Sequence, residues 1–173
     1  KLYSEKKLPK VLMFTGAKGV GKSTLINHFL FSIFDTRNYN RDKNSVIGTS
    51  NFINQFKNGI FENIIYINGS DFRSVKVDDI RNLKFKIFQS TILTKDRFII
   101  LNGIEQFNTN SLNALLKIIE EPTKNNYFFL INNKSKPLLE TIKSRTLEIK
   151  IILKEDQRLK IINNLTSAFD LKL

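Results

Sequence analysis

The chain has 173 residues, with 28 Lys and Arg against 16 Asp and Glu, a formal net charge of +12 and no cysteine. An apolar share of 41% is enough for a folded core and excludes general disorder. The absence of cysteine excludes disulfides and thiolate zinc sites. No apolar run approaches the roughly 20 residues that cross a bilayer. We therefore expect one domain, with at most a fragment of a second, in the cytoplasm and without membrane contact.

The positive charge has two interpretations. Lys and Arg attract the phosphates of nucleic acids. The chain is also rich in Lys, Asn, Ile and Phe together, as AT-rich coding sequences produce, and its Lys residues are scattered along the sequence. Taken alone, the charge leaves both DNA contact and compositional bias open.

Short apolar segments alternate with helical segments from the N-terminus onward. Residues 11–15 predict a buried strand, and a helix is expected over 21–34. The expected buried face of this helix consists of Leu25, Phe29 and Ile33. Residues 35–59 are polar and long for a structureless loop, which indicates an insertion or a short helix.

The same alternation continues to the C-terminus. Further strands are expected at 60–67, 98–101, 127–131 and 147–153. Further helices are expected over 77–90, from Asn108 or Thr109 as the cap to Pro122, and over 137–143. Alternation of this kind predicts an α/β fold, a five-stranded parallel sheet with helices on both faces. A helix from Lys154 indicates a second, incomplete helical domain over 154–173, after a first domain over 1–153.

Residues 16–23, GAKGVGKS, match the phosphate-loop pattern G-x-x-x-x-G-K-[ST]. In such a loop backbone N–H groups surround an anion at the start of a helix. Lys22 would reach the β- and γ-phosphates, and the Ser23 hydroxyl would bind Mg²⁺. A glycine-rich turn that binds nothing has the same composition, but the position between a strand and a helix favours the phosphate loop (P-loop). The predicted nucleotide-binding residues here are Gly16, Ala17, Lys18, Gly19, Val20, Gly21, Lys22, Ser23 and Thr24.

The acidic residues of a hydrolytic P-loop enzyme are missing from their usual place. Such enzymes need an Asp at the end of a second strand to hold Mg²⁺. The strand over 98–101 is instead followed by Asn102 and Gly103. One interpretation, which we favour, is that the site binds ATP without hydrolysing it. The other is that Glu105 reaches the site through an altered turn.

Four segments, in order, resemble the delta-prime subunits of the bacterial DNA polymerase III clamp loader, which are AAA+ proteins. The segments are LMFTGAKGVGKST (12–24), VKVDDIR (75–81), FIILNGIEQFNTNSLNALLKIIEEP (98–122) and FFLINNKSKPLLETIKSRT (128–146). The pattern N-A-L-L-K-x-x-E-E-P followed by T-I-x-S-R is far more specific than a phosphate loop. The tau/gamma ATPase subunits share most of it, and the lost acidic pair favours delta-prime.

The resemblance implies roles for individual residues. Lys22, Ser23 and Thr24 would hold the phosphates and Mg²⁺ of ATP or ADP. Asn132 or Asn133 would occupy the sensor-1 position, which contacts the γ-phosphate. Arg145 would act in trans as an arginine finger on ATP bound to a neighbouring subunit; without the motif, it is simply a surface cation near a strand.

The resemblance also implies cofactors and partners. The partners would be tau/gamma-type and delta-type clamp-loader subunits, the sliding clamp indirectly, and primed DNA within the complex. Many family members carry a four-cysteine zinc module where this chain has residues 35–59 without cysteine, so no zinc is expected. Two alternatives remain: an active AAA+ ATPase of the tau/gamma or another DNA-handling kind, and a free-standing nucleotide-sensing or DNA-binding module.

Overall fold

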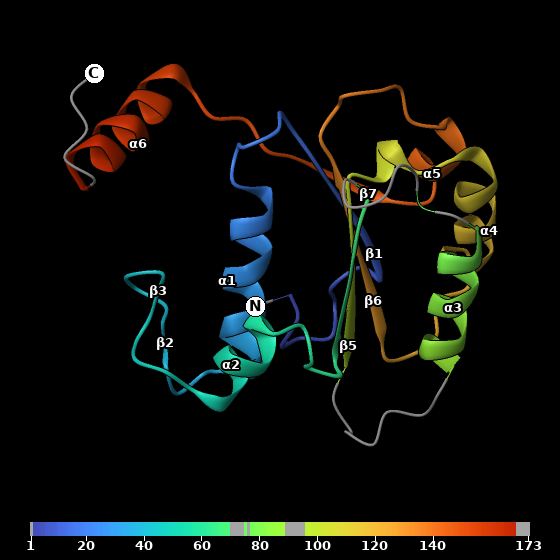
Figure 1. Ribbon diagram of the computed structural model, residues 1–173, viewed down its shortest axis with the longest axis horizontal. Coiled ribbons are helices and arrows are strands. Elements are labelled where there is room, and N and C mark those ends of the chain that lie inside the picture. The colour runs from blue at the N-terminus through green and yellow to red at the C-terminus, as the bar shows by residue number, and fades with distance from the viewer. Residues whose placement is uncertain (1, 70–74, 76, 89–95, 169–173) are drawn as a thin grey trace.

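The computed structural model describes residues 2–69, 75, 77–88 and 96–168 (Figure 1). Its centre is a five-stranded sheet in which the strand order is β4-β5-β6-β1-β7 and every pairing is parallel. The strands are β1 (Val11–Thr15), β4 (Ile64–Asn68), β5 (Arg97–Asn102), β6 (Asn126–Asn132) and β7 (Leu147–Lys150). The predicted α/β fold with a five-stranded parallel sheet is confirmed.

Helices cover both faces of this sheet (Figure 1). On one face lie α1 (Lys22–Phe34) and α2 (Asn51–Lys57). On the other lie α3 (Val77–Phe88), α4 (Thr109–Ile119) and α5 (Glu140–Lys143). A short 3-10 helix, η1 (Ile104–Gln106), follows β5 directly, and α6 (Glu155–Ala168) stands apart from the sheet after β7. None of the helices in the described ranges is long and apolar enough to cross a bilayer.

Two apolar layers hold the helices to the sheet, because successive strand residues point to opposite faces. Met13, Ile99 and Leu130 point toward α3 and α4 and belong to one core cluster. Phe98 and Phe129 point the other way and pack with residues of α1. Between their terminal residues the central strands are therefore continuous apolar runs, as in parallel sheets buried on both faces.

Residues 35–59 contain a hairpin and a helix, which agrees with the predicted insertion or short helix. The hairpin pairs β2 (Tyr39–Asn40) with β3 (Ser45–Val46), and α2 follows. An aromatic cluster ties this region to α1; its rings belong to Phe31, Phe34, Phe52, Phe56 and Phe61. No group of three or more potential metal-binding His, Cys, Asp or Glu side chains occurs among the residues that the structure describes.

Several predicted details differ from the structure. Leu25, expected on the buried face of α1, is 47% exposed, and Ile26 and Leu30 are buried in its place.

The bounds of several elements also differ from the prediction. The strand predicted from residue 60 begins at Ile64, because a turn precedes it in which the Ile64 N–H donates to the Phe61 carbonyl. The helix predicted from Pro137 begins at Glu140. The strand predicted over 147–153 ends at Lys150, and the helix predicted to reach Pro122 ends at Ile119. Residues 89–90 of the predicted helix lie outside the described residues, and the domain boundary after residue 153 stays a prediction.

The predicted cap of α4 is confirmed at Asn108, and it offers a test of local stability. The Asn108 side chain accepts a hydrogen bond from the Ser111 N–H at 2.8 Å and donates one to the Val75 carbonyl at 3.0 Å. Asn108→Ala is therefore expected to lower the free energy of unfolding by about 1–2 kcal/mol. Urea denaturation measures this loss, and Asn110→Ala, an exposed position in the same helical turn, should change stability by less than about 0.5 kcal/mol. Equal losses in the two variants would contradict the capping role.

Candidate functional site

The predicted phosphate loop lies between the end of β1 and the start of α1. Gly19 and Gly21 have φ angles of 84° and 96°, which favour glycine at both positions. Gly16 has a different constraint: a Cβ built on it would lie 2.4 Å from the carbonyl oxygen of Ile151. The loop therefore needs its glycines for backbone conformation at two positions and for close approach at a third.

The N-terminus of α1 opens into this loop without a side-chain cap. Its N-cap residue is Gly21, and the first intrahelical acceptor, the Gly21 carbonyl, is used by the N–H of Leu25. The N–H groups of residues 22–24 have no intrahelical partner for this reason. Unpaired donors at the positive end of a helix form an anion-binding arrangement.

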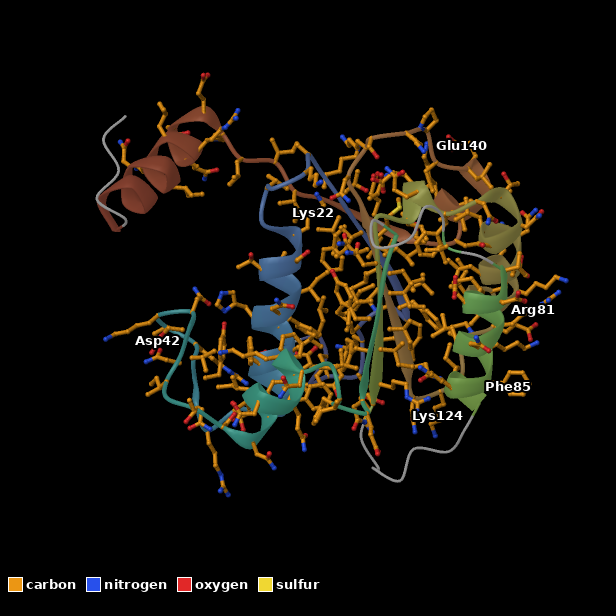
Figure 2. All side chains as sticks on the ribbon, viewed as in Figure 1. Lys22, Asp42, Arg81, Phe85, Lys124 and Glu140 are labelled. Atoms are coloured by element: carbon orange, nitrogen blue, oxygen red, sulfur yellow. The ribbon has the colours of Figure 1, made fainter. Side chains whose placement is uncertain are left out.

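Lys22, labelled in Figure 2, is the first residue of α1, and its hydrogen bonds show that its side chain turns back over the loop. The side chain is buried, with the residue only 3% exposed. Its Nζ donates to the carbonyl oxygens of Gly16 at 2.8 Å and Ala17 at 2.7 Å. Burial lowers the pKa of Lys22, and the negative charge of Glu105 opposes that shift. Lys22 therefore occupies the loop that an anion would enter.

A pocket of about 510 Å³ adjoins the loop. Residues 16–20 form one wall, and the segment that joins β7 to α6 forms another through residues 151–153. Arg158 and Ile161 of α6 complete the lining together with Lys134. Three cationic side chains, Lys18, Lys134 and Arg158, therefore contribute to a pocket that adjoins the N-terminus of α1.

Of the two asparagines predicted at the sensor position, Asn132 lies beside the phosphate loop. It is the last residue of β6, pairs in register with Thr15, and accepts a hydrogen bond from the Gly16 N–H at its backbone carbonyl. Its side chain is buried, and Oδ1 accepts the Lys134 N–H at 2.9 Å. Asn133 is the first loop residue, and its backbone N–H donates to Glu105 at 3.2 Å.

The end of β5 carries an amide where hydrolytic P-loop enzymes carry carboxylates. Asn102 is the last residue of this strand, and its Nδ2 donates to Oδ1 of Asn68 on the neighbouring strand at 3.1 Å. Gly103 follows with a φ of 68°. Asn102 and Gly103 therefore follow β5 as the sequence interpretation had them, and β6 separates this strand from β1, which leads into the phosphate loop.

Glu105 lies closer to the site than its position in the sequence indicated. After Gly103 the chain enters η1, which was not predicted, and this turn buries Glu105 to 6% exposure. Oε2 accepts the Asn133 N–H, and Oε1 accepts the Ser135 hydroxyl at 2.9 Å. The carboxylate contacts the loop after β6 and acts electrostatically on Lys22. The sequence gives only the number of residues between β5 and Glu105. A 3-10 turn changes the direction in which a side chain at that distance from the strand points, so the sequence did not place Glu105.

Arg145 lies in a different part of the molecule, between α5 and β7. Its guanidinium forms an ion pair with Oε1 of Glu120 at 2.7 Å, and its Nη1 donates to the Thr141 carbonyl at 3.1 Å. Glu120 caps the C-terminus of α4, on the face of the sheet opposite α1 (Figure 1). The structure does not bring Arg145 together with the other predicted site residues, which all lie around the start of α1.

A sequence profile of the family described as "DNA polymerase III, delta subunit" matches residues 1–155, most of the chain. The chain belongs to this family. Among curated relatives, the DNA polymerase III subunit delta' of Buchnera aphidicola subsp. Schizaphis graminum is 41% identical over 69 residues, which are 40% of this chain and 21% of that protein. The delta' subunit of Pseudomonas aeruginosa is 36% identical over 76 residues, 44% of this chain and 23% of its own length. The resemblance to delta-prime clamp-loader subunits is confirmed.

Solved structures of AAA+ proteins share the fold of this delta-family chain. A DNA polymerase III gamma subunit-related protein from Thermotoga maritima superposes with a TM-score of 0.67 at 18% identity, over 98% of this chain and 51% of its own. The RuvB Holliday junction branch migration motor of the same organism gives 0.58 at 18% identity, over 98% of this chain and 47% of its own. The chain spans about half the length of these structures, and at this identity they inform the fold alone.

Proposed function

We propose that this delta-family chain binds ATP or ADP with Mg²⁺ in its phosphate loop, hydrolyses little of it, and serves as a structural subunit of a clamp loader. Its partners would be tau/gamma-type and delta-type subunits, and through them the sliding clamp and primed DNA. In this role the chain would also donate Arg145 to ATP bound by a neighbouring subunit.

The observation that carries this proposal is a glycine-rich strand-to-helix loop with the phosphate-loop sequence, in the same sheet as a strand, β5, that ends without carboxylates. Glycines, unpaired helix donors and Lys22 are all present around the loop. The position that should hold Mg²⁺ through an acid is Asn102, whose amide is neutral and bonded to Asn68. Phosphate binding needs only the first set of groups, whereas hydrolysis also needs the missing charge.

The chemistry of the described residues fits a magnesium nucleotide. Phosphate oxygens would replace the Gly16 and Ala17 carbonyls as partners of the Lys22 ammonium. The Ser23 hydroxyl, at the start of α1, is the Mg²⁺ ligand that the motif supplies. When bound, the metal would neutralise phosphate charge, and phosphate oxygens and water would supply the remaining ligands.

The position of Arg145 supports action on another molecule. The residue lies on the α4 side of the sheet, whereas its own phosphate loop leads into α1 on the opposite side (Figure 1). Its side chain is 37% exposed and reaches the surface despite the pair with Glu120. Exposed pairs of this kind contribute about 0–1 kcal/mol, so an incoming phosphate could displace Glu120 at small cost.

The nucleotide-binding proposal is tested by Lys22→Ala. We expect wild-type protein to bind ATP in the presence of Mg²⁺ and the variant to bind about 10- to 100-fold more weakly, because charge-assisted bonds to the phosphates are lost. Isothermal titration calorimetry measures both affinities. Lys124→Ala, an exposed cation at the opposite end of the sheet (Figure 2), is the control and should bind as wild type does.

Binding that is unchanged in Lys22→Ala, or absent from the folded wild-type protein, would contradict a nucleotide site at this loop. The melting temperature of each variant should be measured alongside, because Lys22 also bonds two carbonyls within the loop.

A second candidate function is that of an active ATPase. It is favoured by the DNA polymerase III subunit gamma of Buchnera aphidicola subsp. Acyrthosiphon pisum, which is 25% identical over 87% of this chain and 40% of its own length. It is also favoured by the buried carboxylate of Glu105 near Lys22. Brisk ATP turnover by this chain alone, abolished by Lys22→Ala, would establish the ATPase and reject the structural role.

A further inference from the structure

The loop after β6 is held in place by one buried carboxylate. Glu105 accepts the backbone N–H of Asn133 with one oxygen and the hydroxyl of Ser135 with the other. The next residue of η1, Gln106, donates to the same hydroxyl at 2.6 Å. Glu105 is therefore bonded to the residues on either side of Lys134, and the 3-10 turn and the loop form one connected unit.

Lys134, which lies between Asn133 and Ser135, connects this loop to the side chain of Asn132 through a hydrogen bond. Lys134 has a φ of 58°, in the left-handed region that a lysine rarely adopts. This conformation directs its N–H to Oδ1 of Asn132 at 2.9 Å. With Oδ1 engaged, the Asn132 amide presents Nδ2 as its remaining polar group, and no acceptor for Nδ2 occurs among the described residues.

The orientation of the Asn132 side-chain amide decides whether it attracts or repels a bound anion. The terminal torsion of an asparagine is broad, so both orientations are accessible unless a partner selects one. One orientation offers an N–H donor and the other offers a carbonyl oxygen, which a phosphate repels. The Asn132 backbone carbonyl accepts the Gly16 N–H, so this residue adjoins the phosphate loop.

We propose that Glu105 is a positioning residue that orders loop 133–135 and thereby fixes the Asn132 amide with its N–H donors available to the terminal phosphate of a bound nucleoside triphosphate. The inference rests on the proposed nucleotide function. It assigns Glu105 a different role from that of a metal ligand or a water-polarising base, because both carboxylate oxygens are already used by the loop.

Two substitutions separate geometry from charge. Glu105→Ala removes both hydrogen bonds to the loop. Glu105→Gln keeps them, since its Oε1 can accept the Asn133 N–H while its Nε2 donates to the Ser135 oxygen. A positioning role therefore predicts that alanine disrupts the site and glutamine preserves it. Glu121→Ala, an exposed acid just beyond α4, is the control for loss of charge alone.

The first measurement is amide hydrogen exchange in the absence of nucleotide. In Glu105→Ala we expect exchange at the backbone amides of Asn133 and Lys134 to rise about 10-fold or more, because their acceptors are lost or displaced. Glu105→Gln and Glu121→Ala should exchange as wild type does. Exchange in Glu105→Ala equal to that of the wild type would overturn the proposal.

The second measurement compares ATP and ADP affinity by titration calorimetry. Glu105→Ala should weaken ATP by about 10-fold relative to ADP, since only the triphosphate reaches the Asn132 amide. Asn132→Ala should give the same loss, and adding Glu105→Ala to it should cause no further loss, because the two residues act through one contact.

Other outcomes reject the inference. Equal weakening of ATP and ADP would reduce Glu105 to a general structural residue, and a Glu105→Gln variant that behaves like Glu105→Ala would assign its effect to charge. A folded wild-type protein that binds neither nucleotide would overturn the proposed function and the use of Asn132. The exchange experiment would still decide whether Glu105 orders the loop.

Discussion

Arg145→Ala is expected to lower ATP hydrolysis by an assembled clamp loader about 10³-fold, the lower end of the range for an arginine finger. A guanidinium offered across a subunit interface offsets the charge that develops on the transferring phosphoryl group. The measurement is DNA-stimulated ATP turnover by this chain in its full-length form, reconstituted with its tau/gamma-type and delta-type partners. The effect should appear in turnover and not in complex assembly, which size-exclusion chromatography checks.

Three further variants sharpen this experiment. Arg145→Lys should recover little of the activity, because an ammonium lacks the planar, bidentate geometry of guanidinium. Glu120→Ala should have a small effect, since the ion pair that it removes is solvent-exposed. Arg41→Ala, exposed in the β2–β3 hairpin, should leave turnover unchanged. If Arg145→Ala complexes assemble and turn over ATP normally, Arg145 is a surface cation paired with Glu120 and nothing more.

Phe98→Ala is expected to lower the free energy of unfolding by about 3–5 kcal/mol, as large-to-small substitutions of buried aromatic residues do. Phe98 is fully buried in β5, at 0% exposure. Its ring lies 5.3–5.8 Å, centroid to centroid, from five other aromatic rings, which belong to Tyr3, Phe29, Phe34, Tyr127 and Phe129. Urea denaturation followed by circular dichroism measures the loss.

Phe85→Ala is the matched control for this prediction. Phe85 lies on α3, is 73% exposed, and points away from the body of the molecule (Figure 2). Its replacement should change the free energy of unfolding by less than about 0.5 kcal/mol. Similar losses for both variants would mean that the layer between α1 and the sheet is less tightly packed than the structure indicates.

Secondary structure was largely predictable because its signals are local. The apolar strands at 11–15 and 98–101 are evident from runs of adjacent residues, and the structure confirms them. The same kind of signal placed the cap of α4 at Asn108 or Thr109, and the structure selects Asn108. Which face of α1 packs on the sheet could not be predicted from such local signals. Leu25 with Phe29 and Ile26 with Leu30 have the same spacing, and only packing against β1 and β6 selects Ile26 and Leu30 as the buried pair.

The residues of the candidate site also differ in whether local sequence predicts their positions. The phosphate loop is a continuous motif, so its glycines and Lys22 are identifiable from the sequence pattern. Glu105 could not be placed, because its direction depends on the η1 turn and its partners, Asn133 and Ser135, belong to a loop about 30 residues away in sequence.

The sequence by itself determined the family, the alternation of strands and helices, and the phosphate-loop motif, because each depends on contiguous residues or on their regular spacing. The tertiary structure alone decided which asparagine adjoins Gly16, that Glu105 turns toward the loop after β6, and that Arg145 lies across the sheet from Lys22. These relations join segments that are distant in the chain. They are set by strand order and by hydrogen bonds between loops, which periodicity along one segment does not encode.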